Sequence, residues 1–327
     1  MKKLMMSFLI ILSMVAAGCS PSSQVAKDGE ATDFPKKPIE LIVPYAAGGP
    51  SDSTARVLAK TAEKYLPNGQ TIVIVNKPGG GGTIGLADVF KAKPDGYTIG
   101  LTAIGPVSTQ PHYGNTPYSY DSFQPIMRVS SLPLALVVKS DAPWKTFEEW
   151  LEYAKQNPNK FSYGTTGAGS APQLAMEALN LAAGIQTKPV SFEGNAPVIT
   201  NLLGGHIQGG VILLNEVEPL KDKLRPLVNL GSTKIEPFTD SPLLNEKGID
   251  VSVDITTGVL APKELPQEIL TILHDAFKKA LEDPELLEQF EKLKVNPAYA
   301  GPEDYQKELK ERFDTDGEIL KRVGLIK

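Results

Sequence analysis

The stretch that decides the fold reads Ile39-Glu40-Leu41-Ile42-Val43-Pro44-Tyr45-Ala46-Ala47-Gly48-Gly49-Pro50-Ser51-Asp52-Ser53. A short apolar, β-branched run ends at a proline and a glycine pair and then turns into a helical pattern, which predicts a strand, a tight loop and a helix. We expect Ser51 or Asp52 to cap the helix. Because a first helical turn has unpaired N–H groups and the positive end of the helix dipole, this loop can bind an anion such as a carboxylate. The pattern is equally typical of an ordinary strand-to-helix turn.

The first residues of the chain predict export. Two lysines precede an apolar run from Leu4 to Val15, too short to span a bilayer, and the small-residue exit Ala16-Ala17-Gly18-Cys19 follows. This exit resembles the lipobox of bacterial lipoproteins, in which the cysteine is lipidated and becomes the first mature residue. We therefore expect a signal peptide at residues 1–18 and lipidation of Cys19. Residues 19–33 are mostly small or polar and predict a flexible tether, so that the lipid chains hold the folded body at the outer side of a membrane.

Composition narrows the possible functions. Cys19 is the only cysteine, so an internal disulfide is excluded, and 327 residues suffice for two lobes with cores of their own. The net charge is −5 and becomes more negative by two if Lys2 and Lys3 leave with the signal peptide. Without a basic run, nucleic acid is not an expected partner. A small anionic ligand stays possible, because oriented backbone amides act locally.

A second loop carries a glycine fingerprint. The predicted strand at 71–75 is followed by Gly80, Gly82 and Gly85, which satisfy the G-x-G-x-x-G spacing of dinucleotide sites. The run follows the second strand and not the first, and no acidic residue for a ribose comes directly after the next strand, 98–102. We interpret it as a loop in which the backbone approaches either a ligand or a neighbouring helix closely. An NAD-binding oxidoreductase is a remote alternative that depends on this run alone.

The order of the predicted elements indicates two α/β units. Three strands separated by helical segments predict a parallel sheet, with loops 44–53, 78–85 and 103–109 on one rim. A second unit begins with the apolar run 131–139. From residue 256 the chain crosses back, and three later amphipathic segments predict packing helices without chemistry.

The second unit has its own small-residue loop. We expect Ser170 to be the N-cap of a helix from Gln173 to Ala183, with the N–H groups of 167–170 forming a second edge that faces an anion. Another helix and the strand 209–214 follow. Two such lobes facing each other could close on a ligand like a hinged clamp.

Several sequence blocks together resemble one family. The stretch 43–52 resembles the first-loop signature of the solute-binding proteins of tripartite tricarboxylate transporters, also called the Bug family. Further blocks that resemble this family follow in order at 76–79 with 82–85, 94–98, 163–170, 192–197 with 202–205, and 258–262. The match extends from about Phe34 to the end of the chain.

The resemblance implies a fold, a ligand class and partners. It implies an α/β protein with the two-lobed type II periplasmic-binding-protein fold, lobe 1 comprising residues 34–129 and 256–327 and lobe 2 residues 130–255. A small organic acid, a di- or tricarboxylate or another carboxylate, would be held between the lobes and handed to one large and one small membrane subunit. We expect a monomer with no cofactor, no metal and no catalytic residue. The expected ligand-binding residues, carried over from the family's blocks, are Tyr45, Ala47, Gly49, Ser51 and Thr83 in lobe 1 and Thr165, Gly169, Ser170 and Asn195 in lobe 2.

Three departures from the family pattern concern the ligand. Gln173 stands where members commonly carry histidine, and Glu193 stands where a basic residue is frequent. Leu214 lies where some members place Phe-Asp to meet an amine, which makes an amino-acid ligand less expected.

Other classes of function find little support in the residues. His112, His206 and His274 are far apart without metal spacing, and the serine of 167–170 lacks the following glycine of a nucleophile elbow. Carboxylate pairs such as 148–149 are expected to be solvated helix faces. The alternative that stays open is a ligand-binding sensor that reports to a membrane kinase, because the residues do not distinguish transport from sensing.

Overall fold

The computed structural model describes residues 33–192 and 194–327. The predicted signal peptide 1–18, the lipidation site Cys19 and all of the predicted tether except Asp33 lie outside the described residues. The chain from Phe34 to Lys327 forms one compact unit. Among the described residues, no helix combines the length and the apolar character needed to cross a membrane.

One mixed sheet organises this unit. Its order is β2-β1-β3-β9-β4-β7-β5-β6, and β8 and β10 pair with β4. The pairs β1–β2, β1–β3, β5–β6 and β5–β7 are parallel, as the sequence predicts for two α/β units, whereas β4 and β9 pair antiparallel. The strands are β1 (Ile39–Val43), β2 (Ile72–Asn76), β3 (Thr98–Ala103), β4 (Phe123–Lys139), β5 (Ser162–Thr165), β6 (Lys188–Ser191), β7 (Gly209–Leu213), β8 (Leu224–Asn229), β9 (Asp254–Pro262) and β10 (Pro297–Ala300).

Around β1, β2 and β3, helices cover both faces of the sheet, and we call this part the β1–β3 lobe. Alternate residues of a strand face opposite sides. Accordingly Ile39, Leu41 and Val43 belong to one core cluster and Ile42 to another. The first cluster includes α1 (Pro50–Ala62), α8 (Gln267–Glu282) and α9 (Pro284–Lys292), and the second includes α2 (Thr83–Lys91), α3 (Gly105–Ser108) and α10 (Pro302–Arg322).

The second part, which we call the β5–β7 lobe, is built in the same way. In β4, Leu134, Leu136 and Val138 belong to one core cluster and Ala135 and Val137 to another. The first cluster includes α4 (Phe147–Gln156) and α5 (Ala171–Ala183), and the second includes α6 (Asn195–Leu203) and α7 (Leu214–Val217).

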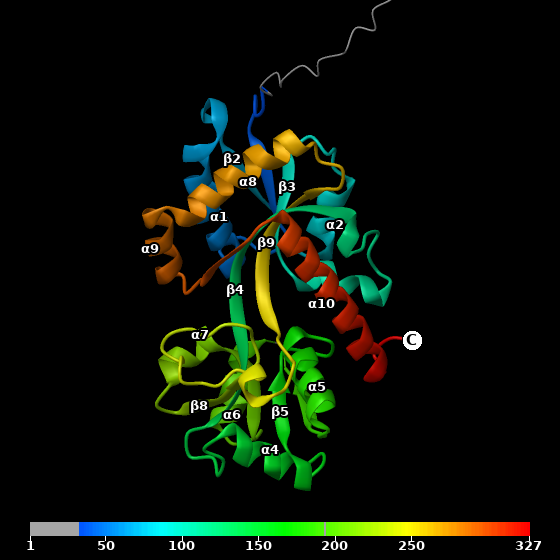
Figure 1. Cartoon of the computed structure of the whole chain (residues 1–327), viewed down its shortest axis with the longest axis vertical. Coiled ribbons are helices and arrows are strands. Elements are labelled where there is room, and N and C mark those ends of the chain that lie inside the picture. The colour runs from blue at the N-terminus through cyan, green and yellow to red at the C-terminus, as the bar shows by residue number, and fades with distance from the viewer. Residues whose placement is uncertain (1–32, 193) are drawn as a thin grey trace, which may run out of the picture. The chain divides into compact units, whose positions relative to one another are not determined.

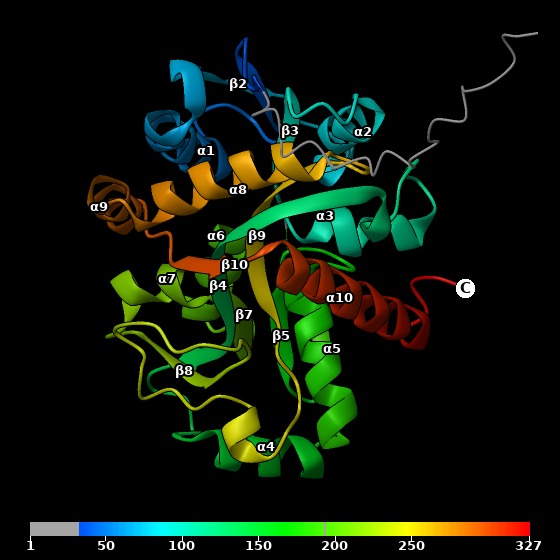
Figure 2. The same ribbon diagram turned by 45° about the horizontal axis from the view of Figure 1, so that its top comes forward.

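Two strands continue from one lobe into the other (Figure 1). The 17-residue strand β4 pairs with β9 from Phe123 to Pro133 and with β7 from Leu134 to Val138. A helix also bridges the lobes, because the end of α10 packs against α5, where Ile319 and Leu320 share a cluster with Leu174 (Figure 2). The predicted boundaries at 129/130 and 255/256 stay predictions.

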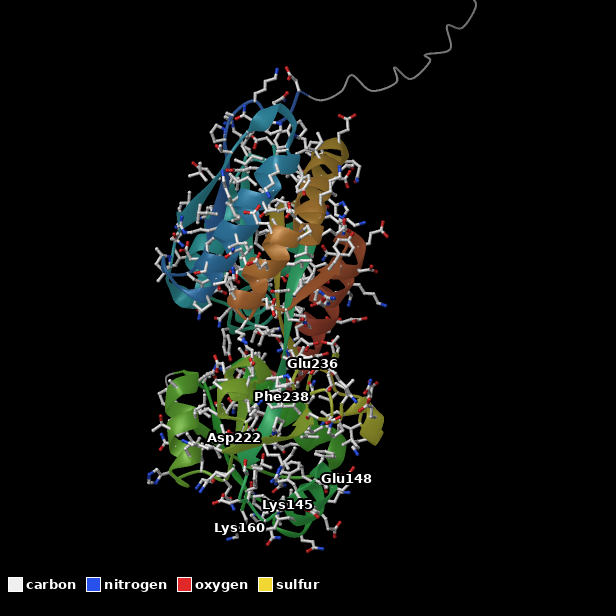
Figure 3. All side chains as sticks on the ribbon, turned by 90° about the vertical axis from the view of Figure 1, so that its left-hand side faces the viewer. Lys145, Glu148, Lys160, Asp222, Glu236 and Phe238 are labelled. Carbon is white, nitrogen blue, oxygen red and sulfur yellow. The ribbon has the colours of Figure 1, made fainter. Side chains whose placement is uncertain are left out.

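The outer surface of the β5–β7 lobe carries charged side chains, among them Lys145, Glu148 and Lys160 (Figure 3). Glu149 accepts the Thr146 N–H and donates its own N–H to the Thr146 hydroxyl, which forms a capping box at the start of α4. Glu148 pairs with Lys247. Glu148 and Glu149 therefore both have structural partners at the surface.

Candidate functional site

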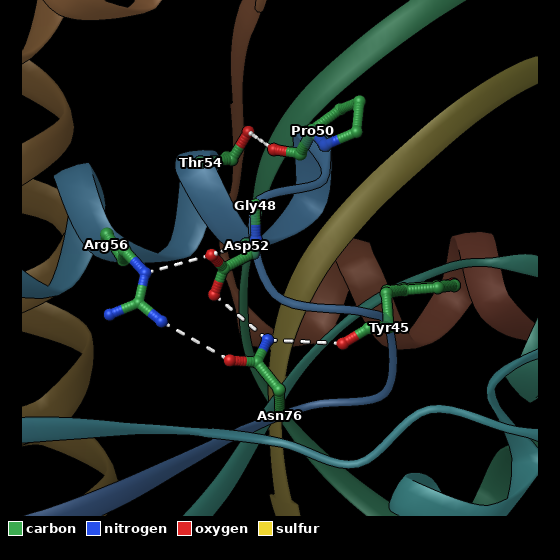
Figure 4. A network of polar contacts seen from close by, with 7 residues as sticks. All are labelled: Tyr45, Gly48, Pro50, Asp52, Thr54, Arg56 and Asn76. Carbon is green, nitrogen blue, oxygen red and sulfur yellow. Dashed lines mark hydrogen bonds and ion pairs between the residues drawn. The ribbon is translucent and has the colours of Figure 1, made fainter.

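The loop after β1 is held by a side-chain network centred on Asp52, whose residue is 3% exposed (Figure 4). Its carboxylate accepts the Gly48 N–H at 2.8 Å and the Arg56 Nε at 2.9 Å. Asn76 at the end of β2 donates to Asp52 Oδ1 at 2.9 Å and to the Tyr45 carbonyl at 3.2 Å. The hydrogen bond from Arg56 is the largest effect on the pKa of Asp52 and lowers it to about 2, so this carboxylate is ionised at neutral pH.

The start of α1 differs from the sequence prediction. The N-cap is Gly49 and not Ser51 or Asp52, and Pro50 occupies the first helical turn. Proline suits this position because its fixed φ matches the helix and its missing N–H would have had no partner there. Asp52 instead bonds back to Gly48 from inside the first turn. The N–H groups of Ser51 and Asp52 have no intrahelical acceptor, which leaves them as donors at this helix start.

The glycine run after β2 packs against the short helix α3, which follows β3. Gly82 has φ +100°, and a Cβ there would lie 2.7 Å from the Pro106 ring. Thr83 donates its hydroxyl to the Gly80 carbonyl at 2.9 Å. Of the two interpretations given above, close approach to a neighbouring helix is therefore observed at Gly82. Burial raises the pKa of the Tyr45 phenol, which lies near Thr102 and Ala103 at the end of β3.

The loop after β5 uses several of its donors internally. Thr165 is fully buried, and its hydroxyl donates to the Gly167 carbonyl at 3.1 Å. The Gly169 N–H donates to Gln173 Oε1 at 2.7 Å. The expected edge of exposed N–H groups is thus partly closed. Ser170 is the N-cap of α5, as predicted, but its side chain makes no capping bond, and its Oγ is buried without a hydrogen-bond partner among the described residues.

Three further polar side chains lie where the neighbouring parallel strands end. Asn195 begins α6 after β6, and Asn215 and Glu216 lie in α7 directly after β7. Asn195 Oδ1, Asn215 Oδ1 and Glu216 Oε2 are buried without a hydrogen-bond partner in the described part of the chain. Burial raises the pKa of Glu216, although the adjacent Asn195 side chain lowers it in part. Because parallel strands end at one edge, these groups share that edge with the loop after β5.

The carboxyl edges of the two lobes face each other. Tyr113, in the loop after β3, occupies the space above Gly169, where a Cβ would come within 1.8 Å of the Tyr113 hydroxyl. On the side of α7, Asn215 Nδ2 donates to the Lys294 carbonyl at 3.2 Å, and Lys294 Nζ pairs with Glu218 at 2.9 Å. Loops from far-apart segments therefore meet between the lobes.

Helix α10 fixes the loop that carries Tyr113. The buried Asp316 carboxylate accepts hydrogen bonds from Ser108 and Thr109 at the end of α3 and from Arg312 on its own helix. The His112 ring stacks on Phe313 with centroids 4.0 Å apart. His112 thus has a packing role.

Comparison with known sequences identifies the family of this chain. The family described as "Tripartite tricarboxylate transporter family receptor", TctC, matches residues 54–325. The chain belongs to the TctC receptor family. A UPF0065 protein in the gbd 5′ region of Cupriavidus necator is 35% identical over 303 residues, covering 91% of this chain and 91% of the relative.

Solved structures agree with the TctC assignment. A TctC solute-binding protein from Polaromonas is 35% identical with a TM-score of 0.83, covering 88% of this chain and 99% of that one. The periplasmic binding protein BugD is 32% identical with a TM-score of 0.67, covering 89% and 99%. The structure of R. palustris Rpa4515 with adipate is 26% identical with a TM-score of 0.69, again covering 89% and 99%. The resemblance to the Bug family and the two-lobed periplasmic-binding fold are confirmed.

TctC membership decides between receptor and enzyme. The family and the structural neighbours are periplasmic solute-binding receptors and not enzymes. The glycine run at Gly80, Gly82 and Gly85 therefore belongs to a receptor, and the oxidoreductase alternative is set aside.

The nine predicted contact residues of this TctC receptor all lie at the two facing edges, with different accessibility. Ala47 is exposed, and Tyr45, Gly49, Ser51, Thr83, Ser170 and Asn195 are half-buried. Thr165 and Gly169 are buried; Thr165 is bonded to Gly167, and the Gly169 N–H is bonded to Gln173 of α5. Their contact with a ligand stays a prediction.

Sequence reasoning missed Asn76, Gln173, Asn215 and Glu216. Gln173 was noted only as a departure from histidine, yet it holds the Gly169 amide. A usable signal existed for Asn215 and Glu216, because they follow the third parallel strand of their lobe just as 166–170 and 194–195 follow the other two.

Proposed function

We propose that this receptor captures a small organic acid outside the cytoplasm and delivers it to one large and one small membrane subunit of a tripartite transporter. The observation that carries the proposal is the pair of facing edges, each with a helix start. α1 offers the N–H groups of Ser51 and Asp52, and α5 offers the buried, unpartnered Ser170 hydroxyl.

One carboxylate of the ligand binds at the loop after β1. The amides at the start of α1 and the Ser51 hydroxyl are the donors, with Tyr45, Ala47, Gly49 and Thr83 around them. Asp52 is ionised nearby, but Arg56 and Asn76 bond to it and offset its charge, so an anion is tolerated.

The β5–β7 lobe completes the site through Thr165, Gly169, Ser170 and Asn195. The adipate-bound relative Rpa4515 supports a dicarboxylate or a similarly sized carboxylate as the ligand class. Main-chain donors and a hydroxyl gather at the start of α1, so the site selects a carboxylate group first and the rest of the ligand second.

The receptor is held at the outer face of a membrane by lipidation of Cys19, with residues 19–33 as the tether, and acts as a monomer. A lipid-anchored protein partitions with membranes. A Cys19→Ser variant should move from the membrane fraction to the soluble fraction. Retention of the variant in the membrane fraction would contradict the anchor without affecting ligand capture.

Calorimetric titration with succinate, adipate, citrate and aromatic acids tests the binding function. In denaturation experiments with and without ligand, a carboxylate at a hundred times its Kd should add about 2.7 kcal/mol to the free energy of unfolding. Recovery of the bound acid unchanged is expected of a receptor, and no binding by any carboxylate would refute the proposal. Deletion of the protein should abolish uptake of the radiolabelled acid, whereas loss of induction alone would indicate the sensor.

A further inference from the structure

Three buried hydrogen-bond acceptors gather at the carboxyl edge of the β5–β7 lobe. They are Asn195 Oδ1, Asn215 Oδ1 and Glu216 Oε2, and the structure gives them no partner among the described residues. The sheet order places β5 between β6 and β7, so Asn195 reaches Glu216 across the end of β5. The three acceptors thus lie on the same edge of the sheet as Ser170, with Asn195 beside Glu216 and Asn215 next to Glu216 in the chain.

The orientation of both amides is defined by their other contacts. Asn215 Nδ2 donates to the Lys294 carbonyl at 3.2 Å, which directs its oxygen elsewhere. The Asn195 side chain lies beside the Glu216 carboxyl and lowers its pKa, as a donor does. The edge therefore presents oxygen acceptors, with amide nitrogens already engaged by the protein.

The charges around Glu216 do not supply a partner. Lys294, whose carbonyl accepts from Asn215, pairs through its Nζ with Glu218 at 2.9 Å. The ion pairs of the described residues include none to Glu216. The Asn195 side chain meets this carboxyl, but its Oε2 has no hydrogen-bond partner among the described residues. A buried acceptor without a donor is costly, so a partner for Oε2 is expected from a bound molecule or from water.

A carboxylate cannot be that partner, because an ionised carboxylate accepts hydrogen bonds and has no hydrogen to donate. A hydroxyl, an amide or an ammonium group can satisfy the three oxygens. We propose that the ligand carries, besides the carboxylate bound at α1, a hydrogen-bond donor that meets Asn195, Asn215 and Glu216, and that Glu216 is the residue that selects it. This inference rests on the proposed carboxylate-binding function. It narrows the ligand to carboxylic acids that also carry a hydroxyl, an amide or an amino group.

Titration calorimetry of the purified receptor with matched acids tests the inference. The first set is adipate and its two analogues in which one terminal carboxylate is replaced by a hydroxyl or an ammonium group. The second pair is succinate and malate, which differ by one hydroxyl. We expect a donor-bearing acid to bind at least about tenfold more tightly than its parent diacid.

Variants of Glu216 identify the residue responsible. Glu216→Leu removes the acceptor and should bring the ratio of the donor-bearing acid's affinity to the diacid's affinity close to one. Glu216→Gln keeps an acceptor oxygen and should keep the preference for a hydroxyl but lose that for an ammonium group. Glu218→Gln is the matched control on the same segment, because it breaks only the pair with Lys294 and should leave the ratio unchanged. Thermal unfolding without ligand checks that each variant folds.

The outcomes separate the two proposals. The donor inference is overturned if the diacids bind as tightly as the donor-bearing acids or more tightly, or if the affinity ratio of the two kinds of acid persists in Glu216→Leu. In either case a measurable affinity for any of these acids still supports the receptor function. Absence of binding by every acid of both sets refutes the carboxylate-binding function itself, and the inference with it.

Discussion

Asp52 connects several parts of the first loop through one buried carboxylate. It joins the Gly48 amide, the Arg56 guanidinium and the Asn76 amide, which in turn holds the Tyr45 carbonyl. The shape of the loop at the start of α1 is therefore set by side chains from the end of β2 and from α1. These residues position the donors of the proposed site without having to contact the ligand.

Replacing Asp52 by Asn should destabilise the protein by about 1–2 kcal/mol at neutral pH, since the half-exposed Arg56 is partly screened by solvent. The pKa of Asp52 is lowered from 3.8 to about 2 on folding, so its contribution is present above pH 3.8 and is lost as the pH falls through 2. Urea unfolding across this range should show the difference between wild type and variant shrinking. Asp88→Asn, which breaks the exposed pair with Lys77, is the control and should show a smaller loss.

Ser170 offers a sharp test of ligand contact. Because its hydroxyl makes no capping bond, Ser170→Ala should leave the unfolding temperature nearly unchanged. If the hydroxyl binds the ligand carboxylate, affinity should fall by about 1.5–3 kcal/mol, the value of a hydrogen bond to a charged group. Calorimetric titration of Ser170→Ala beside the exposed control Ser191→Ala measures this. Equal affinities in the two variants would contradict the placement of Ser170 in the site.

Among the elements, α10 does more than the sequence indicated. It was expected to be a packing helix without chemistry, and it indeed contributes Tyr305 and Leu309 to a core. In addition, Asp316 binds the end of α3 and thereby positions the loop that carries Tyr113. The stripe of apolar residues predicted the helix, but only the folded chain shows that a polar residue on it serves the edge between the lobes.

Asp316→Ala should cost about 3–5 kcal/mol of stability, because it leaves the buried Arg312 guanidinium without its carboxylate. Asp314→Ala on the same helix breaks an exposed pair with Lys310 and should cost no more than about 0.5 kcal/mol. Chemical denaturation of both variants gives the comparison. Similar losses for the two would show that burial of Asp316 has no energetic consequence.

The sequence predicted most elements and misjudged some of their ends. β1 lies where the apolar run predicts it, and Ser170 is the N-cap of α5. The long strand β4 was expected to begin at 131 but begins at Phe123. Proline is unfavourable inside a strand, yet the ladder with β9 accommodates Pro125 through a register shift next to it. Local patterns cannot indicate this, because the partner strand lies more than a hundred residues away.

At the scale of the whole molecule, the two lobes meet at Tyr113 and Gly169. A Gly169→Ala variant would place a methyl group 1.8 Å from the Tyr113 hydroxyl, so one of the two loops must move. We expect weaker ligand binding and lower stability, and we expect Tyr113→Ala to restore part of both. A double-mutant cycle should give an interaction energy of about 1 kcal/mol or more. Simple additivity would show that the contact does not couple the lobes. Gly184→Ala, at a similar φ of +66° with nothing within 4 Å, controls for the backbone strain alone.

The candidate site could be predicted in part from the sequence for a physical reason. Small-residue loops that follow strands can be recognised in the sequence alone, so the loops at the starts of α1 and α5 were predicted. The acceptors at Asn215 and Glu216 could not be found in this way, because their meeting with Asn195 depends on the order β7-β5-β6 in the sheet. The network from Asn76 to Asp52 likewise joins residues that only strand pairing brings together.

The last residues of the chain pack at the boundary between the lobes. Val323, Leu325 and Ile326 lie against the cluster formed by Leu174 on α5 and Leu320 on α10. A purification tag fused directly after Lys327 would therefore start beside this boundary and disturb the packing of the two lobes there. A tag fused ahead of Phe34 would not disturb this packing. Affinities measured with tags at the two ends should differ, and the fusion at the start of the folded body reports the native value.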